Sequence, residues 1–349
     1  MKATVCIDAR MIFSSGIGTY LQNLIPKMEK SFKMTLLIRK SDEKWAREHF
    51  SSELITVDVP IYTVKEQLIY PFCIPSCDLF WSPHYNIPLL PILAKKRIVT
   101  IHDVCHLAMP HFFPKWKGKM ASFLLKGAVK RSDLVLTVSE FSRKEIASYL
   151  PVAGDKIHVL PNGAPEKNEE GDFSLKDFGL NQPFILYVGN SKPHKNVDRL
   201  LKAFFHLSPC YDLVLVGPEK CFSTVQNHTR IKRLYKVSDE KLYFLYKKAE
   251  LLVHPSLYEG FGLTPLEAMN FGCPVVASHA ASIPEVCGEA AYYVDPYDEK
   301  ALYQGMKEVL ENRELRQKLI KAGYKQEKKF SWDKTAKRLI ELFTIETSL

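Results

Sequence analysis

Two carboxylates, Glu259 and Glu267, stand eight residues apart in a stretch whose residue types could bind a hydroxyl-rich ligand. The apolar run 251–253 comes before them and is typical of a buried strand. Gly260 and Gly262 lie between the two carboxylates, where glycine lets the backbone turn sharply and approach a ligand. Free backbone amides at the start of a following helix would attract negative charge. The stretch is therefore a candidate site for a ligand with hydroxyl and anionic groups.

The same residues also allow a purely structural interpretation. Thr264, Pro265 and Glu267 match the N-cap, N1 and N3 positions of a capping box, which predicts that a helix starts there. In that case Glu267 reaches back to the helix start, and Glu259 is a solvated loop acid. The residue types alone leave both interpretations open.

Two motifs in the N-terminal half could contribute to a ligand site. Gly16 and Gly18 open a helical pattern shortly after a predicted strand, as phosphate-binding loops do, but they lack the full dinucleotide fingerprint. His102 and Asp103 end another predicted strand, at the sheet edge where doubly wound folds bind ligands. A lone histidine is more often structural, so these residues need support from the rest of the chain.

The ordered set of motifs resembles the family 4 retaining glycosyltransferases, whose glutamate-x7-glutamate motif matches Glu259 and Glu267. Each further motif is weak alone, whereas the set is specific and covers nearly the whole chain. The further motifs are Gly16-Ile17-Gly18-Thr19-Tyr20, His102-Asp103, Pro161-Asn162-Gly163, Tyr187-Val188-Gly189, Pro193-His194-Lys195-Asn196, His254-Pro255-Ser256, Gly272-Cys273-Pro274-Val275-Val276 and Ile283-Pro284-Glu285-Val286.

The resemblance implies a catalytic set of His102, Lys195 and Glu259. Glu259 would hold hydroxyls of the donor sugar on its reacting face, Lys195 would meet the diphosphate, and His102 would contact the transferred sugar. Retaining members are thought to react on one face of the sugar, with the leaving phosphate taking the acceptor proton. We therefore expect no protein general base, and we expect Glu285 to cap or pack.

The resemblance also implies a set of donor-binding residues. Glu267 would bind the ribose hydroxyls of the nucleotide while still capping its helix. The glycine loop of the N-terminal half would lie against the donor diphosphate. The other candidates are backbone amides that would reach the sugar and the phosphates. The set beside Glu267 is Gly16, Gly18, Gly189, Asn190, Lys192, Phe261, Gly262 and Leu263.

One position departs from the family pattern. The arginine that usually follows the strand and Gly189 is Asn190 here, which removes part of the expected phosphate clamp. Lys192 lies in the same loop, and we interpret it as a substitute. Ordinary loop solubility is the alternative explanation for Lys192 and Lys195.

The predicted activity is retaining transfer of a hexose from a nucleoside-diphosphate sugar to a glycan or lipid-linked acceptor, in surface-polysaccharide or glycolipid assembly. Cations and amides would stabilise the charge that develops on the leaving diphosphate. The Pro-His-Lys-Asn and Pro-Glu-Val elements are similar to bacterial mannosyltransferases, so GDP-mannose is the first donor and a UDP-sugar is the alternative. A sugar-nucleotide epimerase and a non-enzymatic nucleotide-binding subunit are the rival classes. The resemblance implies no metal and no cofactor.

The composition excludes several classes of protein. Hydrophobic residues make up 46% and charged residues 25% of the 349-residue chain, as in a globular protein. No apolar run approaches the ~20 residues that span a bilayer, and the N-terminus lacks the order of a secretion signal. We therefore expect a cytoplasmic protein, with attachment to the inner face of the cell membrane as an option. His102, Cys105 and His106 could ligate zinc, but no second matching cluster follows.

The net charge of +9 fits an anionic small molecule or an anionic lipid surface, and no known nucleic-acid module is present. Residues 115–131 form a predicted helix with six basic residues and no acid. Four apolar residues share one face at helical spacing: Met120, Phe123, Leu124 and Ala128. The plain interpretation is a surface helix packed on its sheet, and the alternative is contact with an anionic membrane.

Short apolar runs alternate with helical patterns, which indicates an α/β fold of parallel βαβ units in doubly wound sheets. We predict an N-terminal acceptor-side Rossmann-like domain at 1–165 and a nucleotide-sugar-binding one at 166–349, with a last helix near 332–344 that packs back on the first domain. Two such domains facing across a cleft form the GT-B architecture. Residues 61–92, rich in proline and aromatic residues, are either an irregular packed connection or an acceptor-facing wall. The predicted strands are 4–9, 34–39, 55–60, 97–102, 133–139, 157–160, 184–189, 212–216, 251–254, 274–278 and 291–294.

Overall fold

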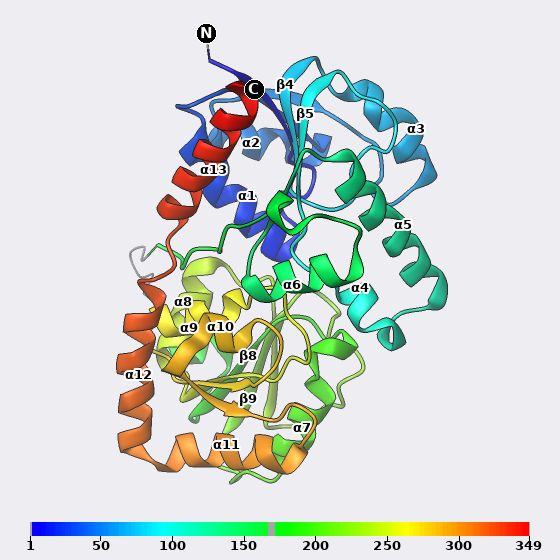
Figure 1. The fold of residues 1–349 in the computed structure, drawn as a ribbon. Coiled ribbons are helices and arrows are strands. Elements are labelled where there is room, and N and C mark those ends of the chain that lie inside the picture. Colours follow the sequence, from blue (N-terminus) through cyan, green and yellow to red (C-terminus); the bar gives the residue numbers. More distant parts are fainter. Residues whose placement is uncertain (1, 167–171, 349) are drawn as a thin grey trace. The chain divides into compact units, whose positions relative to one another are not determined.

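The computed structural model describes residues 2–166 and 172–348. The chain divides into two compact units, drawn in Figure 1. Unit 1 consists of Met1–Gly163 and Ser331–Leu349, and unit 2 consists of Ala164–Phe330. Each unit holds one parallel sheet with helices packed on it, so the predicted α/β class with two Rossmann-like domains is confirmed.

Unit 1 contains a seven-stranded sheet with the order β3-β2-β1-β4-β5-β6-β7. Its strands are β1 (Thr4–Asp8), β2 (Lys33–Ile38), β3 (Glu53–Thr56), β4 (Cys77–Ser82), β5 (Ala94–Thr100), β6 (Leu134–Thr137) and β7 (Ile157–Val159). Its helices are α1 (Ser15–Met28), α2 (Glu43–His49), α3 (Val64–Cys73), α4 (Cys105–Ala108), α5 (Lys115–Arg131), α6 (Glu140–Tyr149) and α13 (Trp332–Ser348).

The strand order of unit 1 reverses between β1 and β4. The chain runs outward from β1 to β3 and then returns to pair β4 with β1, with Val5 opposite Leu79 and Ile7 opposite Trp81. Doubly wound folds bind ligands at such a switch point, at the carboxyl ends of the two strands. The loops that leave β1 and β4 are therefore placed for function.

Helix α13 contributes to the core of unit 1 although it comes from the far end of the chain. Phe343 is fully buried, with its ring centroid 5.5 Å from that of Trp81 and 6.0 Å from that of Phe32. Trp332 packs on Tyr20 of α1, with ring centroids 6.1 Å apart. Gly163 is packed so closely against Trp332 that a β-carbon there would clash, which gives the Pro-Asn-Gly motif a structural reason.

Unit 2 contains a six-stranded sheet with the order β10-β9-β8-β11-β12-β13, and its switch point lies between β8 and β11. Its strands are β8 (Phe184–Val188), β9 (Asp212–Gly217), β10 (Ile231–Tyr235), β11 (Leu251–His254), β12 (Val275–Ser278) and β13 (Ala291–Val294). Its helices are α7 (Val197–Phe205), α8 (Asp239–Lys248), α9 (Leu263–Asn270), α10 (Ile283–Cys287), α11 (Glu299–Glu311) and α12 (Arg313–Glu327).

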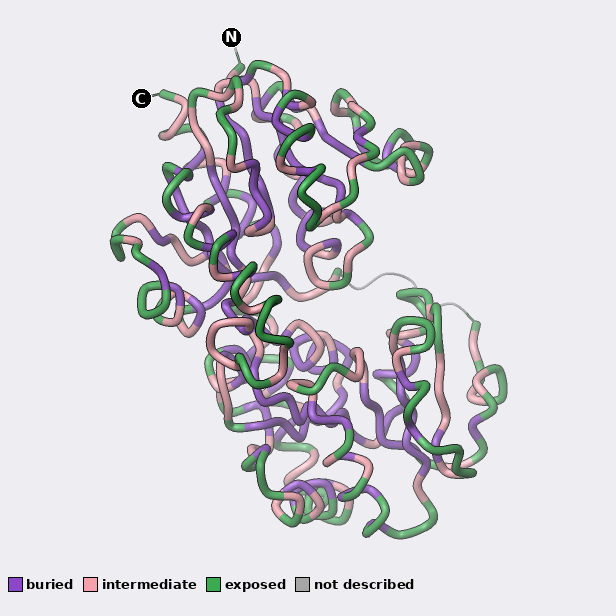
Figure 2. The backbone as a smooth tube through the Cα atoms, turned by 90° about the vertical axis from the view of Figure 1, so that its right-hand side faces the viewer, coloured by how far each residue is buried: buried purple, intermediate pink, exposed green. Residues whose placement is uncertain are grey.

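Both faces of the unit 2 sheet are covered. In β9, Leu213 and Leu215 join the hydrophobic cluster on one face, whereas Val214 and Val216 join the cluster on the other. Strands that are buried on both faces have continuous apolar sequences, and most strands of this sheet could therefore be predicted. Figure 2 shows the buried backbone along the middle of each unit.

Two strands were missed and one helix face was predicted wrongly. Residues 61–92 contain α3 and β4 rather than an irregular connection, and the edge strand β10 escaped notice because Lys232 and Arg233 interrupt its apolar pattern. Helix α5 has the predicted bounds, but its buried residues are Ala121, Leu124, Leu125, Ala128 and Val129. Met120 and Phe123 are exposed, so only Leu124 and Ala128 of the predicted face are buried.

Candidate functional site

An ion pair between Lys195 and Glu259 lies beyond the carboxyl ends of β8 and β11. The lysine Nζ atom is 2.7 and 2.9 Å from the two carboxylate oxygens. The ring of His254, the last residue of β11, places Nε2 3.1 Å from Glu259 Oε1. Burial alone would raise the pKa of Glu259, but the Lys195 ammonium and the His254 ring hold that pKa well below its usual range. The structure thus brings together two of the three predicted catalytic residues, both on the switch-point edge of unit 2.

Backbone contacts explain why the two loops meet. The Leu257 amide donates a hydrogen bond to the His194 carbonyl, with 2.7 Å between nitrogen and oxygen. Asn196 adopts a left-handed backbone conformation with φ of 62°. Its buried Nδ2 donates to the Pro255 carbonyl at 3.0 Å and to the Pro296 carbonyl at 2.7 Å. Asn196 therefore fastens the loop that carries Lys195 (residues 189–196, the lysine loop) to the loop that carries Glu259 (residues 255–262, the glutamate loop).

Two serines bond main-chain carbonyls of the glutamate loop, and neither was predicted as a site residue. Ser282 Oγ lies 2.9 Å from the carbonyl oxygen of Glu259 and 2.8 Å from that of Phe261. Ser278 Oγ donates to the carbonyl oxygen of Ser256 at 2.5 Å. Both serines are fully buried. Ser278 ends an apolar strand and Ser282 follows that strand. This position is the only sequence signal that could have pointed to them.

The predicted capping box is wrong. Helix α9 begins at Leu263, and Gly262 is its N-cap residue with φ of 104°. A β-carbon at Gly262 would lie 2.7 Å from Ile283 Cδ1, so glycine is required by both conformation and space. Because the helix starts before Thr264, Glu267 is in its second turn and cannot reach back to the helix start.

Glu267 instead bonds a tyrosine. Its Oε2 accepts a hydrogen bond from the Tyr246 hydroxyl, at 2.8 Å. Burial raises the pKa of Glu267 above its usual value. Burial disfavours the ionised form of this carboxylate. A ligand that donates hydrogen bonds to it, as a ribose diol does, would stabilise that form.

The loop after β8 is shaped by Asn190. The Tyr187 hydroxyl donates to the Asn190 carbonyl at 2.6 Å, and Asn190 Oδ1 accepts from the Lys192 amide at 3.1 Å. Gly189 has φ of 152°, and its carbonyl is packed against Gly217. Asn190 thus bonds the main chain of its own loop, and Lys192 is exposed beside it.

The other predicted residues, His102, Gly16 and Gly18, lie in unit 1. His102 follows β5, and its Nε2 is 3.0 Å from the Pro83 carbonyl oxygen. Burial lowers the pKa of His102, so the ring is neutral and donates this bond. Gly16 is in the first turn of α1, and a β-carbon at Gly18 would lie 2.5 Å from the Ile12 carbonyl oxygen.

The zinc interpretation gains no support. The His106 ring stacks on Phe113, with centroids 4.1 Å apart. Within residues 2–166 and 172–348, no three histidine, cysteine, aspartate or glutamate side chains gather as metal ligands would. The eight cysteines are free thiols.

Comparisons with known proteins match both halves of the chain to glycosyltransferase families. The family described as Glycosyltransferase Family 4 matches residues 14–167, and the one described as Glycosyl transferases group 1 matches residues 171–326. An Escherichia coli protein named O-antigen chain mannosyltransferase B is 33% identical over 275 residues, which cover 73% of this chain and 72% of the relative.

Solved structures agree in fold. Sucrose-phosphate synthase from Thermosynechococcus elongatus superposes with a TM-score of 0.82 at 19% identity, covering 99% of this chain and 98% of that one. The Anabaena protein HepE, solved in complex with UDP-glucose, has a TM-score of 0.77 at 16% identity, covering 99% of this chain and 100% of that one.

Proposed function

Because the chain belongs to family 4 of the glycosyltransferases, we propose that it moves mannose from GDP-mannose to a glycan or lipid-linked acceptor, with retention of the anomeric configuration. The chain is a hexosyltransferase, and the similarity to an O-antigen mannosyltransferase supports mannose as the sugar. The product would enter the assembly of a surface polysaccharide or glycolipid.

The Lys195–Glu259 pair is the observation that carries the proposal. A donor diphosphate that enters this edge would take hydrogen bonds from Lys195, and Glu259 would accept from the sugar hydroxyls. The ammonium group then offsets charge that grows on the departing diphosphate, where a fixed cation is most effective. The exposed Lys192 and the amides of Phe261 to Leu263 are the further phosphate donors that we propose. This chemistry uses no metal ion and no cofactor.

The donor is tested by thermal unfolding of the purified chain with GDP, UDP, ADP, GDP-mannose, UDP-glucose and UDP-N-acetylglucosamine. A nucleotide at a hundredfold excess over its Kd stabilises the folded state by about 2.7 kcal/mol, which raises the Tm by roughly 5–10 °C in a unit of this size. We expect that rise with GDP and GDP-mannose. A rise with the uridine compounds alone would replace the donor, and no rise with any nucleotide would contradict the proposal.

Two lysine variants locate the phosphate contact. Lys195→Met removes the ammonium group and should weaken GDP-mannose binding by roughly ten- to a hundredfold, the usual effect of losing a charged hydrogen bond. Lys192→Met keeps the Lys195 pair intact and should weaken binding less. Unchanged donor affinity in Lys192→Met would remove Lys192 from the site, and unchanged affinity in Lys195→Met would contradict its proposed role.

A UDP-sugar is the second candidate donor. The HepE structure holds UDP-glucose on the same fold, which is the observation that favours it. Isothermal titration with GDP-mannose and UDP-glucose under identical conditions separates the two.

We also propose that unit 1 contacts an anionic membrane surface through α5. Among the residues that the structure describes, no helix combines the length and the apolar character needed to cross a bilayer. Helix α5 exposes Trp116 and Phe123 among its lysines, with 61% and 66% of their surfaces accessible. Exposed aromatic residues between cations suit the interface of an anionic bilayer.

Helix α3 lies on the same side of unit 1 as α5 in Figure 1, and it also exposes apolar residues. Leu89 links the two helices, because its amide bonds Gln67 Oε1 of α3 at 2.9 Å and its side chain packs on Gly127 of α5. Helix α3 adds an exposed stripe at helical spacing, formed by Val64, Leu68 and Phe72.

Sedimentation with vesicles tests the membrane contact. We expect the chain to bind phosphatidylglycerol vesicles and not phosphatidylcholine vesicles, and the double variant Trp116→Ser, Phe123→Ser to lose binding roughly tenfold or more. Tyr297→Ser in unit 2 is the matched control, because Tyr297 is 60% exposed. Equal sedimentation with both lipids, or with the double variant and the control, would contradict the proposal.

A further inference from the structure

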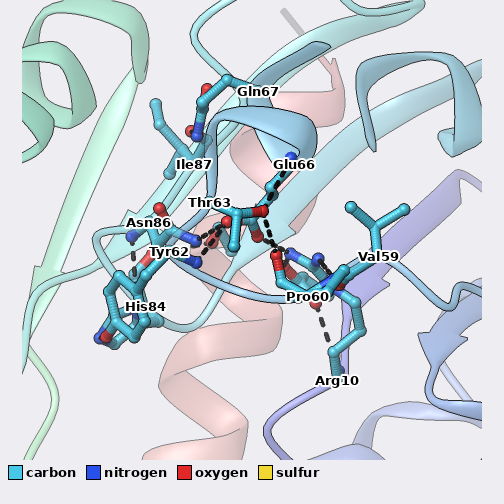
Figure 3. A network of polar contacts seen from close by, with 12 residues as sticks. Arg10, Val59, Pro60, Tyr62, Thr63, Glu66, Gln67, His84, Asn86 and Ile87 are labelled. Atoms are coloured by element: carbon cyan, nitrogen blue, oxygen red, sulfur yellow. Dashed lines mark hydrogen bonds and ion pairs between the residues drawn. The ribbon is translucent and has the colours of Figure 1, made fainter. Parts of the chain in front are cut away.

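A buried polar network occupies the switch point of unit 1, where β1 and β4 end (Figure 3). Arg10, two residues beyond β1, is 1% exposed. Its Nε and Nη2 atoms bond the Asp8 carboxylate at 2.8 and 2.7 Å, and Nη2 also bonds Glu66 Oε1 at 2.7 Å. The guanidinium carbon lies 3.6 Å from the centroid of the Tyr70 ring. The charge of Arg10 is therefore compensated by Asp8 and Glu66 inside unit 1, and Arg10 cannot bind an anionic ligand.

Glu66 fixes two loops with its other oxygen. Oε2 accepts from the Tyr62 amide at 2.7 Å and from Asn86 Nδ2 at 2.6 Å. Tyr62 lies in the loop after β3 and has φ of 66°, a left-handed conformation that is rare for a bulky residue. Such strain persists only where the surrounding contacts hold it, and it gathers at ligand-binding sites.

The main chain of Asn86 fixes the tautomer of His84, which lies in the loop after β4. Its Nδ1 accepts from the Asn86 amide at 3.2 Å, so the ring proton is assigned to Nε2. Nε2 lies 2.8 Å from the Tyr62 hydroxyl oxygen and donates to it. The Tyr62 hydroxyl thus receives one hydrogen bond from His84.

The exposed part of this network is uncharged. Burial lowers the pKa of His84 to about 3, and burial together with the Tyr85 hydroxyl raises the pKa of Tyr62. Burial also raises the pKa of Tyr85 to about 12. The Tyr85 ring lies against His84, with centroids 4.2 Å apart, and Tyr62 is 41% exposed. Neutral hydroxyls on aromatic rings suit an uncharged polyhydroxylated ring, which stacks and exchanges hydrogen bonds.

We propose that Tyr62 and His84 form the site on unit 1 that binds a hydroxyl group of the acceptor's terminal sugar, and that Glu66 is a positioning residue for both. The inference rests on the proposed function, because it takes the sugar to be the acceptor of transfer. The site needs no donor to be present, so it is measured separately from nucleotide binding.

Saturation-transfer NMR on the ligand-free full chain tests the site with three probes: the methyl α-glycosides of mannose, glucose and galactose. We expect at least one probe to bind. Tyr62→Phe removes one hydroxyl group from a partly exposed side chain and should weaken binding about tenfold, the usual effect of one lost hydrogen bond. Tyr149→Phe is the matched control, because Tyr149 is 42% exposed at the C-terminal end of α6, and it should bind as wild type does.

Two histidine variants separate recognition from folding. His84→Gln keeps an N–H donor and should bind the probe within threefold of wild type, whereas His84→Leu should lose about tenfold. Nitrogen-15 NMR of the His84 ring should show the Nε2–H tautomer without titration between pH 5 and 8. The Nδ1–H tautomer, or titration in that range, would overturn the inference.

The remaining outcomes also decide the inference. No saturation of any probe by wild type, or equal binding by wild type and Tyr62→Phe, overturns it. GDP and UDP thermal shifts are recorded on the same variants and should equal those of wild type. Probe binding without any nucleotide shift would leave the sugar site standing and reject the donor proposal, whereas the reverse would reject the sugar site alone.

Discussion

At the scale of single residues, the two glutamates of the motif differ in what the fold does to their charge. Lys195 and His254 stabilise the ionised form of Glu259, whereas burial disfavours the ionised form of Glu267. Glu259 therefore contributes stability that is present above the unfolded pKa of ~4.3 and is lost as the pH falls through its lowered folded value. Glu267 behaves in the opposite way, because its stabilising effect is present below ~4.3 and is lost as the pH rises through its raised folded value.

Glu267→Gln should therefore stabilise the ligand-free chain at pH 8, by about 1 kcal/mol, because it removes a carboxylate that burial disfavours. The gain should shrink toward pH 4, where the wild-type group is protonated. The same variant should reduce the nucleotide-induced rise in Tm, since the amide offers one uncharged acceptor oxygen where the carboxylate offers two charged ones.

Thermal unfolding from pH 4 to pH 8, with and without nucleotide, measures both effects. Glu285→Gln is the control, because Glu285 is exposed and should show neither of them. A stability difference between Glu267→Gln and wild type that does not change with pH would contradict the electrostatic explanation.

At the scale of elements, periodicity in the sequence predicted the buried strands and missed what depends on tertiary contact. Strand β11 has the predicted bounds, because an apolar run defines it. The start of α9 was wrong, because Ile283 packs on Gly262 and no local pattern reports that. Asn196, which joins the two loops of the site, and Ser282, which bonds the main chain of the glutamate loop, were not predicted as site residues for the same reason.

Asn196 combines a left-handed backbone with two buried hydrogen bonds, and two substitutions separate these contributions. Asn196→Gly keeps the conformation but leaves the Pro255 carbonyl without its donor, which should cost about 1–3 kcal/mol. The Pro296 carbonyl keeps a second hydrogen bond, from Arg199 Nη1 at 2.9 Å. Asn196→Ala loses the same hydrogen bonds and keeps a β-carbon in the left-handed region, so it should be less stable than Asn196→Gly by about 1–2 kcal/mol.

Urea unfolding measures the two free energies, and donor affinity should fall in the same order. Equal stability of the glycine and alanine variants would show that the left-handed conformation relaxes at no cost.

At the scale of the whole molecule, the chain enters unit 2 after Gly163 and returns to unit 1 at Ser331. Phe343 of the returning helix is fully buried in unit 1, so unit 1 depends on a segment that follows unit 2 in sequence. Each unit should respond separately to substitutions in its own core.

Phe343→Ala should destabilise unit 1 by about 3–5 kcal/mol, since it leaves a cavity beside Trp81. Hydrogen exchange should rise in β1, β4 and α1, while β8 and β11 keep their protection. Ile345→Ala is the control on the same helix, because Ile345 is 52% exposed, and it should change stability by no more than about 0.5 kcal/mol. Equal loss of protection in both sheets would show that the units unfold together.

The return of α13 to unit 1 also sets the order of events at the ribosome. Residues 164–330 must be made between the first segment of unit 1 and its last helix. At about 5–20 residues per second, the nascent first sheet waits roughly ten to thirty seconds for the ring of Phe343 to pack on Trp81 and Phe32. During that interval unit 2, which is continuous in sequence, has all that it needs to fold. The part of the chain that is translated first is therefore the part that is completed last.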